Sequence, residues 1–444
     1  MKLIGKSNKG EKFMYSRVVQ FVTVCIVILF LNNCVFFKLK EDLELVKKNT
    51  GIGGEIKNRS PEGKSIIAIL YTENDGKKQI AGFRAITDKE GFYFFMVPIG
   101  EYNIIAFEDA NANFAYDAGE YFGLIGSPDP IRVSSLTPIE NLHITIDKTD
   151  GFPEGFPVDI SNLNAASAIA GVATGTIITL ADDRFSDETA KMGFWQPITF
   201  MHHASIGIYF LEEYDAAKTP ILFVHGAAGT PRNFSDIVKN IDRNRYQPWF
   251  YHYPSGVPLE KASRFLNRLV RILHEQYHFE TLYVTAHSMG GLVSRSFILQ
   301  NVFEDGNDYV KLFVSISTPW GGLETAQKGV EKAPTAIPSW HDVVPDSPFI
   351  QTVFNQSLKP QVDYFLLFSF HGDSSMFMDN NDGTVTLRSQ LDLRAQKDAL
   401  QRWGFDEGHV TILSSPDVLE KYNEILEMTR SGGKGGFNWF GLTK

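Results

Sequence analysis

Cysteine is almost absent from this chain of 444 residues, which contains only Cys25 and Cys34, both close to the N-terminus. The rest of the chain therefore has no disulfide, no thiolate ligand for a metal and no cysteine nucleophile. The lack of cysteine beyond residue 34 also suits an oxidising compartment.

Basic residues are outnumbered by acidic ones, since 42 lysines and arginines against 52 aspartates and glutamates give a net charge of -10. No basic cluster occurs beyond the extreme N-terminus, whereas phosphate backbones are bound by basic faces. We therefore expect no nucleic acid partner. Hydrophobic residues at 43% and charged residues at 21% indicate a globular protein of two or three domains.

The first 34 residues have the composition of a targeting segment. A positively charged start is followed by an apolar run over residues 18–31, broken only by Gln20 and Thr23. Such a run is typical of a secretory signal and is short for a membrane span. It ends at Leu31-Asn32-Asn33-Cys34, which resembles a bacterial lipobox with two asparagines in place of the usual small residues. The resemblance implies acylation of Cys34.

Two other interpretations of this segment stay open, an uncleaved anchor helix that continues through residues 35–37 and simple cleavage. The lipoprotein and the anchor both tether the protein to a membrane. The sequence therefore predicts a secreted, membrane-anchored protein, a bacterial lipoprotein of the cell envelope.

Short strands separated by Gly, Asp and Lys turns follow a mixed, charged stretch. We predict strands at residues 65–71, 79–87, 91–98 and 102–107, which together indicate a small antiparallel β-sandwich. Residues 91–109, GFYFFMVPIGEYNIIAFED, resemble transthyretin-like or carboxypeptidase-regulatory-like β-sandwich domains.

The loop after the last of these strands has oxygen-bearing side chains at EF-hand spacing. Counted from Asp109, they fall at positions 1, 3, 5, 9 and 12: Asp109, Asn111, Asn113, Asp117 and Glu120. This spacing predicts a calcium site. The loop has Phe114 where an EF-hand loop needs glycine, and an ordinary Asn/Asp turn is the alternative.

From residue 206 the pattern changes to apolar strands that alternate with helices. Strands are expected at residues 220–224, 247–253, 282–287, 311–317 and 362–370, and the helix over 259–277 has one apolar face. Nearly continuous apolar strands indicate a mostly parallel sheet covered on both faces, an α/β fold. The predicted segments are a signal or anchor (1–34), a spacer (35–62), the β-sandwich (63–148), a linker and lead-in (149–205), the α/β domain (206–430) and a Gly-rich tail (431–444).

Ser288 lies at a predicted strand–turn–helix junction, in the sequence Ala286-His287-Ser288-Met289-Gly290. A serine on so sharp a turn exposes its hydroxyl, and only small residues fit two positions away on either side. The pattern is G-x-S-x-G with alanine at the first small position. We therefore predict that Ser288 is a nucleophile.

A serine nucleophile needs a histidine base and an orienting acid, and on this turn the chain order is serine, acid, histidine. Asp382 lies in a polar loop after the strand at 362–370, and His409 is the only histidine that follows it. Asp379 is the rival acid. A plain turn at Asp382 and a surface position for His409 are the alternatives. We expect His287 to be structural or to line the substrate site.

An oxyanion needs preorganised donors. The backbone N–H of Met289, directly after the nucleophile, is expected to supply one. The N–H of Ala227, in the Gly-rich turn after the strand at 220–224, is expected to supply the other.

Five motifs in order resemble bacterial lipases and the related GPI inositol-deacylase-like α/β hydrolases. They are His225-Gly226-x-x-Gly229, residues 286–291, Ser317-Thr318-Pro319-Trp320-Gly321-Gly322, Asn381-Asp382-Gly383-x-Val385 and Gly408-His409. The resemblance spans residues 206–428. It implies an α/β-hydrolase fold and hydrolysis of a carboxylic ester through an acyl-enzyme, but it does not fix the substrate. We expect lipid or other acyl esters as substrates and no cofactor for catalysis.

Two other functions use the same residues. One is a surface binding protein that holds ligands on a hydrolase fold without turnover, and the other is an amide or peptide hydrolase with the same triad. The proline-rich insertion at residues 323–358 is either a lid over the acyl site or a packed surface excursion.

Overall fold

The computed structural model describes residues 35–45, 48–58, 65–74, 76–86, 92–111, 115–154, 172–204, 206–372 and 379–430. The predicted signal or anchor with Cys34, calcium-loop residue Asn113 and the Gly-rich tail lie outside these ranges. Within these ranges, no helix combines the length and the apolar character needed to cross a bilayer.

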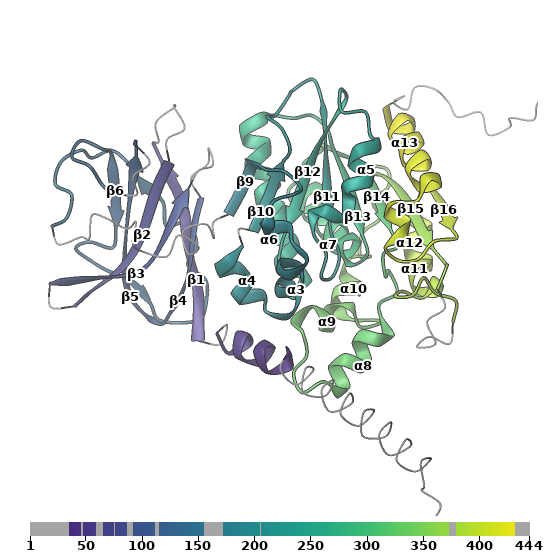
Figure 1. Cartoon of the computed structure of the whole chain (residues 1–444), viewed down its shortest axis with the longest axis horizontal. Helices are drawn as coiled ribbons and strands as arrows, with labels where there is room; N and C mark the ends of the chain where they lie inside the picture. The colour runs from purple at the N-terminus through teal and green to yellow at the C-terminus, as the bar shows by residue number, and fades with distance from the viewer. Residues whose placement is uncertain are drawn as a thin grey trace, which may run out of the picture.

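Two sheets, mostly antiparallel, form the N-terminal region (Figure 1). The first has the order β4-β1-β8, with β1 at Asn49–Lys57, β4 at Phe92–Pro98 and β8 at Ile144–Thr145. The second has the order β3-β2-β5-β6, with β2 at Ser65–Asn74, β3 at Lys77–Ile86, β5 at Gly100–Asp109 and β6 at Phe122–Ile125. A short strand β7 (Ile131–Val133) also pairs with β5. Both sheets contribute to one apolar core, for example Ile52 of β1 and Ile66 of β2.

Strand β1 lies inside the segment that the sequence predicts to be a spacer. Three glycines lower its intrinsic strand propensity, which hid it from the pattern. The structure uses these glycines for close packing: a Cβ at Gly54 would lie 2.0 Å from the carbonyl oxygen of Leu142.

Residues 35–45 form a helix that packs on the C-terminal domain, beside α4 (Pro197–His203). The carboxylate of Asp42 accepts hydrogen bonds from the backbone N–H of Ile198 (2.8 Å) and of Thr199 (2.7 Å). The residue at the N-cap of α4, Gln196, provides no side-chain bond of its own. Asp42 therefore caps α4 from a distant part of the chain.

The C-terminal domain is built on an eight-stranded sheet with the order β16-β15-β14-β13-β11-β12-β10-β9. Its strands are β9 (Val172–Ile177), β10 (Ile206–Phe210), β11 (Thr219–Val224), β12 (Tyr246–His252), β13 (Leu282–His287), β14 (Val310–Ile316), β15 (Asp363–Ser369) and β16 (Gln401–Phe405). All neighbouring strands are parallel except β10 and β12. The predicted mostly parallel sheet is confirmed.

The predicted boundary at residue 206 falls inside this domain. Strand β9 is the edge of the sheet, and α3 (Asp187–Trp195) and α4 follow it before residue 206. With Gly175 at its centre and small residues around it, β9 resembles a linker in sequence, and only its pairing with β10 defines it.

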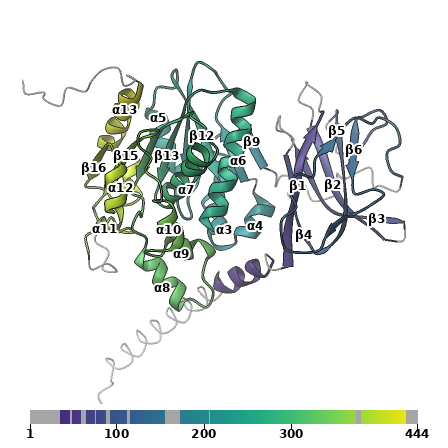
Figure 2. The ribbon, with the colours of Figure 1, turned by 180° about the vertical axis from the view of Figure 1, so that it is seen from behind.

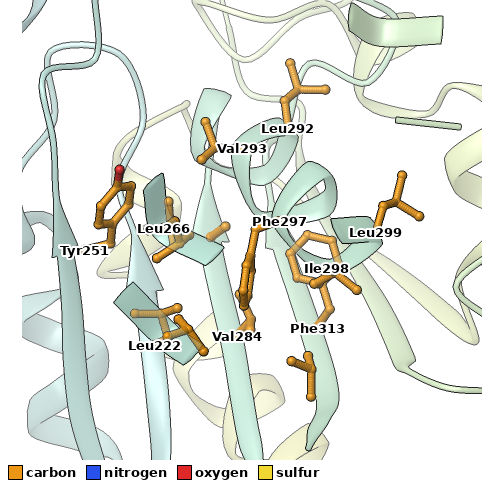
Figure 3. Close-up of a cluster of buried hydrophobic side chains, with 14 of the residues drawn as sticks. Leu222, Tyr251, Leu266, Val284, Leu292, Val293, Phe297, Ile298, Leu299 and Phe313 are labelled. Carbon is orange, nitrogen blue, oxygen red and sulfur yellow. The ribbon is translucent and has the colours of Figure 1, made fainter. Parts of the chain in front are cut away.

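Helices cover both faces of the sheet (Figures 1 and 2). Helices α6 (Leu259–Tyr277) and α7 (Met289–Ile298) pack on one face, and α5 (Ser235–Asn240) and α13 (Pro416–Arg430) pack on the other. Figure 3 shows Leu266 of α6 and Phe297 of α7 above Leu222 and Val284, which belong to the central strands. Burial on both faces explains why these strands read as continuous apolar runs.

The insertion after β14 forms three helices, α8 (Glu324–Lys332), α9 (Pro338–Val343) and α10 (Pro348–Thr352). Its apolar side chains Val343, Phe349 and Ile350 are buried in the main core, and Ile337 is buried as well. The carboxylate of Asp342 accepts the N–H of Leu259 at 2.6 Å and so caps α6. The insertion is therefore packed firmly against the domain. This favours the predicted packed surface excursion over the predicted lid.

The order in which the chain adds strands to the sheet reverses at β11. It runs from β11 to β12 on one side, then crosses to β13 on the other side. In open α/β sheets, ligands bind outside the carboxyl ends of the strands at such a switch point. His225 and Gly226 follow β11 there, and Ser288 follows β13.

Candidate active site

Ser288 occupies a strained turn between β13 and α7, with φ 55° and ψ −132°. A positive φ is costly for a residue with a side chain and persists only where the surroundings enforce it. Glycines supply the close approach here: a Cβ at Gly290 would lie 2.4 Å from the carbonyl oxygen of Val224, and one at Gly226 would lie 2.7 Å from Cβ of Ser288. The strand, turn and helix predicted around Ser288 are all present.

The structure brings Ser288, His409 and Asp382 together from three separate loops. Nε2 of His409 lies 2.8 Å from Oγ of Ser288, and Nδ1 of His409 lies 2.8 Å from Oδ2 of Asp382. Because a carboxylate only accepts, the ring proton belongs on Nδ1, which leaves Nε2 free to accept the serine proton. The rival acid, Asp379, is exposed. His371 lies at the surface and pairs with Asp406.

The carboxylate of Asp382 is buried and heavily hydrogen-bonded. Oδ2 also accepts from Oγ of Ser369 (2.7 Å) and Nε2 of Gln390 (3.1 Å), and Oδ1 accepts from the N–H of Val385 (2.7 Å). Burial raises its pKa, but the bonds from His409, Val385 and Ser369 outweigh burial and hold the pKa below its ordinary value. Asp382 is therefore ionised at neutral pH.

Sequence reasoning named Ser317 only within a family motif, with no role, and did not identify Ser369 or Gln390. Oγ of Ser369 lies 2.6 Å from Oγ of Ser317, so a line of hydroxyls leads to the carboxylate of Asp382. Ser317 directly follows β14, and Ser369 is the last residue of the neighbouring strand β15. Their shared position at the carboxyl ends of neighbouring strands was the one sequence signal that could have grouped them. Gln390 lies in the short helix α11 (Leu387–Gln390) and carried no signal.

Two buried histidines flank the site. Nε2 of His287 lies 2.7 Å from the carbonyl oxygen of His409, and burial lowers the pKa of His287 to about 3. The ring of His225 stacks on Tyr253 with centroids 4.5 Å apart, and burial lowers the pKa of His225 to about 4. Both side chains are therefore neutral at neutral pH.

The loop after β11 is held in a defined shape beside Ser288. The N–H of Ala228 donates to Oγ of Ser255 (2.9 Å), and that of Gly229 donates to the carbonyl of Gly226 (3.1 Å). Among the described residues, the N–H groups of Ala227 and Met289 have no such backbone acceptor. Met289 is the first residue of α7, where backbone N–H groups lack helical partners. The predicted oxyanion donors therefore lie in segments that contact or adjoin Ser288.

Four of the five predicted calcium ligands can be located. The two carboxylate oxygens of Glu120 accept the N–H groups of Ala110 (2.8 Å) and Asp117 (2.9 Å). Nδ2 of Asn111 donates to Asp117 at 2.8 Å. Over the described part of the chain, no three His, Cys, Asp or Glu side chains are grouped to hold a metal ion. The calcium site stays a prediction, and Asn113 lies outside the described residues.

The model of one protein family, described as the alpha/beta hydrolase fold, matches residues 219–381. No curated protein matches the chain. With this family match and the sheet order above, the chain has an α/β-hydrolase fold. The matched segment contains Ser288 and ends one residue before Asp382.

Many solved structures resemble the chain at low identity. A Bacillus licheniformis lipase in its mature form is 18% identical, and the match covers 49% of this chain and 94% of that one with a TM-score of 0.40. A putative aryl esterase from Burkholderia cenocepacia is 16% identical, covering 49% and 93%, with a TM-score of 0.34. A phospholipase from Legionella pneumophila is 15% identical, covering 39% and 45%, with a TM-score of 0.33. Similarity at this level carries no information on the substrate.

Proposed function

We propose that this protein is a serine hydrolase that cleaves carboxylic esters of lipids or other acyl groups through an acyl-enzyme. One observation carries the proposal: a single imidazole, that of His409, bridges Oγ of Ser288 and the carboxylate of Asp382 at 2.8 Å on both sides. This is the geometry that general-base activation of a serine requires.

The reaction follows from this arrangement. Nε2 of His409 takes the hydroxyl proton as Oγ of Ser288 attacks the ester carbonyl carbon, and Asp382 stabilises the resulting imidazolium. The N–H groups of Ala227 and Met289 stabilise the oxyanion. The bond to the alcohol oxygen then breaks, and His409 returns the proton to that oxygen. A water molecule, deprotonated by His409, releases the acid and restores Ser288.

Hydrolysis of p-nitrophenyl esters with acyl chains from short to long tests the proposal. We expect Ser288→Ala to lose on the order of 10³-fold or more in kcat, because the nucleophile is gone while oxyanion donors and binding remain. A fluorophosphonate probe should label the wild-type protein and not the variant. The same acyl group presented as an amide separates an esterase from an amidase.

Two results would count against this function. If wild type and Ser288→Ala hydrolyse esters and amides equally slowly and the probe labels neither, the protein binds ligands without turnover. If turnover persists in the variant, another residue is the nucleophile.

We also propose that the N-terminus tethers the enzyme to a membrane through acylated Cys34. The apolar run at residues 18–31 and the lipobox-like Leu31-Asn32-Asn33-Cys34 support this. The helix at residues 35–45, which follows Cys34 in sequence, packs on the hydrolase domain and lies near α9 in both views. Labelling cells with a radioactive fatty acid tests the tether: Cys34→Ala should abolish the label, and label on the variant would contradict acylation.

A further inference from the structure

His287 directly precedes the nucleophile and contacts the backbone of the base. It is the last residue of β13, and its Nε2–H donates to the carbonyl oxygen of His409 over 2.7 Å. Both residues are buried, with His287 6% exposed and His409 8% exposed. This hydrogen bond spans 122 positions of sequence and joins the central strand to the loop that carries the base.

The loop around His409 is irregular, and its ends are tied by backbone bonds such as that from the N–H of His371 to the carbonyl of Glu407 (2.9 Å). Residues 406–410 belong to no helix or strand, and the next residue, Val410, is 59% exposed. The backbone N–H of His409 donates to the carbonyl of Asp382 at 2.8 Å, and its carbonyl accepts from His287. The two sides of this residue's backbone are therefore tied to different parts of the site.

The contact also sets the distance over which the proton moves. His287 and Ser288 are consecutive residues at the end of β13. The side chain of His287 binds the carbonyl of His409, and the ring of His409 contacts Oγ of Ser288. Loss of the bond would leave the carbonyl of His409 without its donor in a buried position and let this residue shift within the loop. A misplacement of about 1 Å costs on the order of 10²-fold in rate.

A neutral donor suits this position better than a cation. The rings of His287 and His409 lie 4.8 Å apart, centroid to centroid. A positive charge at His287 would oppose the protonation of His409 that each catalytic step requires. Burial holds the pKa of His287 at about 3, so it donates its proton to the hydrogen bond without adding a charge.

We propose that His287 is a positioning residue, whose hydrogen bond to the backbone carbonyl of His409 holds the base in register with Ser288. This inference rests on the proposed function of the Ser288–His409–Asp382 site. His287 acts through His409 and does not contact the reacting atoms itself.

Two substitutions at residue 287 separate the hydrogen bond from the volume of the side chain. In His287→Gln the amide nitrogen reaches about where Nε2 lies and can donate, whereas His287→Leu fills the space without a donor. We expect kcat of His287→Leu to fall by about 10- to 100-fold with KM changed by less than about threefold. His287→Gln should recover most of the lost kcat.

His252→Leu is the matched control. His252 is another buried histidine, on β12, and its ring lies near those of Phe185 and Phe200 and 5.6 Å from that of His225, centroid to centroid. If His287→Leu acts merely by disturbing the core, His252→Leu should lower kcat to a similar extent. We expect the control to keep wild-type kcat. Thermal unfolding of all three variants shows whether each is folded at the assay temperature.

The rate of fluorophosphonate labelling gives a second readout, because it reports the activation of Ser288 without any chosen substrate. His287→Leu should label more slowly than wild type, and His287→Gln should label nearly as fast. Equal labelling and equal kcat in His287→Leu, with an active wild type, would overturn the positioning role and leave the proposed function intact. A wild type that neither labels nor turns over would overturn both.

Discussion

At the scale of single residues, the site depends on groups that are held in conformations they would not adopt alone. Ser288 keeps a positive φ because small residues around it let backbone and side chains approach closely. Asp382 stays ionised although buried, because hydrogen bonds compensate for the lost hydration. The local cost at both residues is offset by the packing of the rest of the domain.

The carboxylate of Asp382 is expected to set the tautomer of His409. In Asp382→Asn an amide can present N–H to Nδ1, which favours the tautomer with its proton on Nε2 and removes the acceptor for the Ser288 proton. We expect kcat to fall on the order of 10⁴-fold, as for the equivalent change in serine proteases. Steady-state kinetics with an ester substrate measures this.

Asp379→Asn, a change at the exposed rival acid three residues away, is the control and should keep wild-type kcat. A drop for Asp379→Asn with an active Asp382→Asn would reverse the assignment of the acid.

At the scale of elements, side chains from distant segments cap the N-termini of helices. Helix α4 lacks a side-chain cap of its own, and the helix at residues 35–45 supplies one through Asp42. Helix α6 is capped in the same way by Asp342 of the insertion. Such caps satisfy the free N–H groups at a helix start and place a negative charge near the positive end of the helix dipole.

Removal of the cap on α4 should destabilise the protein. Asp42→Ala leaves the N–H groups of Ile198 and Thr199 without their acceptor in a site that is only 3% exposed at residue 42. We expect a loss of about 1–3 kcal/mol in the free energy of unfolding. Urea denaturation measures the loss.

Limited proteolysis should also cut near residues 35–45 faster in Asp42→Ala, because the helix loses its main polar contact with α4. Glu41→Ala, on the exposed side of the same helix, is the control and should behave as wild type. Equal stability of Asp42→Ala and wild type would mean that the helix does not hold α4 in solution.

At the scale of the whole molecule, three buried histidines make the fold sensitive to acid. Burial lowers the pKa of His225 to about 4, that of His287 to about 3, and that of His252 well below its ordinary value. An unfolded chain takes up these protons near pH 6.5, whereas the folded protein does not. Between about pH 6.5 and 4 the unfolded state therefore binds more protons, and stability falls as the pH is lowered.

Each of these histidines should contribute up to about 1.4 kcal/mol of lost stability per pH unit in that window. Asp342 and Asp363 act in the opposite direction, because burial raises their pKa and the folded state takes up their protons first. Urea denaturation at pH 7.5, 6.0 and 5.0 and constant ionic strength measures the net slope. His252→Leu should reduce this slope by the contribution of one histidine. An unchanged slope in that variant would contradict the assignment of the acid sensitivity to the buried histidines.

The sequence by itself predicted the α/β class of the C-terminal domain and the three candidate residues that the structure brings together. Continuous apolar strands alternating with helices predict a mostly parallel sheet, because side chains that pack on both faces leave a local pattern. Small residues around Ser288 mark the sharp turn, and the scarcity of histidine after Asp382 leaves His409 alone. The structure brings these three side chains within hydrogen-bonding distance, and their catalytic roles stay predictions.

Only the tertiary structure decided which distant groups meet. The glycine-containing strands β1 and β9 have weak local signals and are defined by their partner strands. The bonds from Ser369 and Gln390 to Asp382, from His287 to His409 and from Asp42 to α4 depend on how packed elements bring their ends together. No periodicity records such contacts, because a hydrogen bond between segments far apart in sequence constrains one side chain at each end and not the pattern around it.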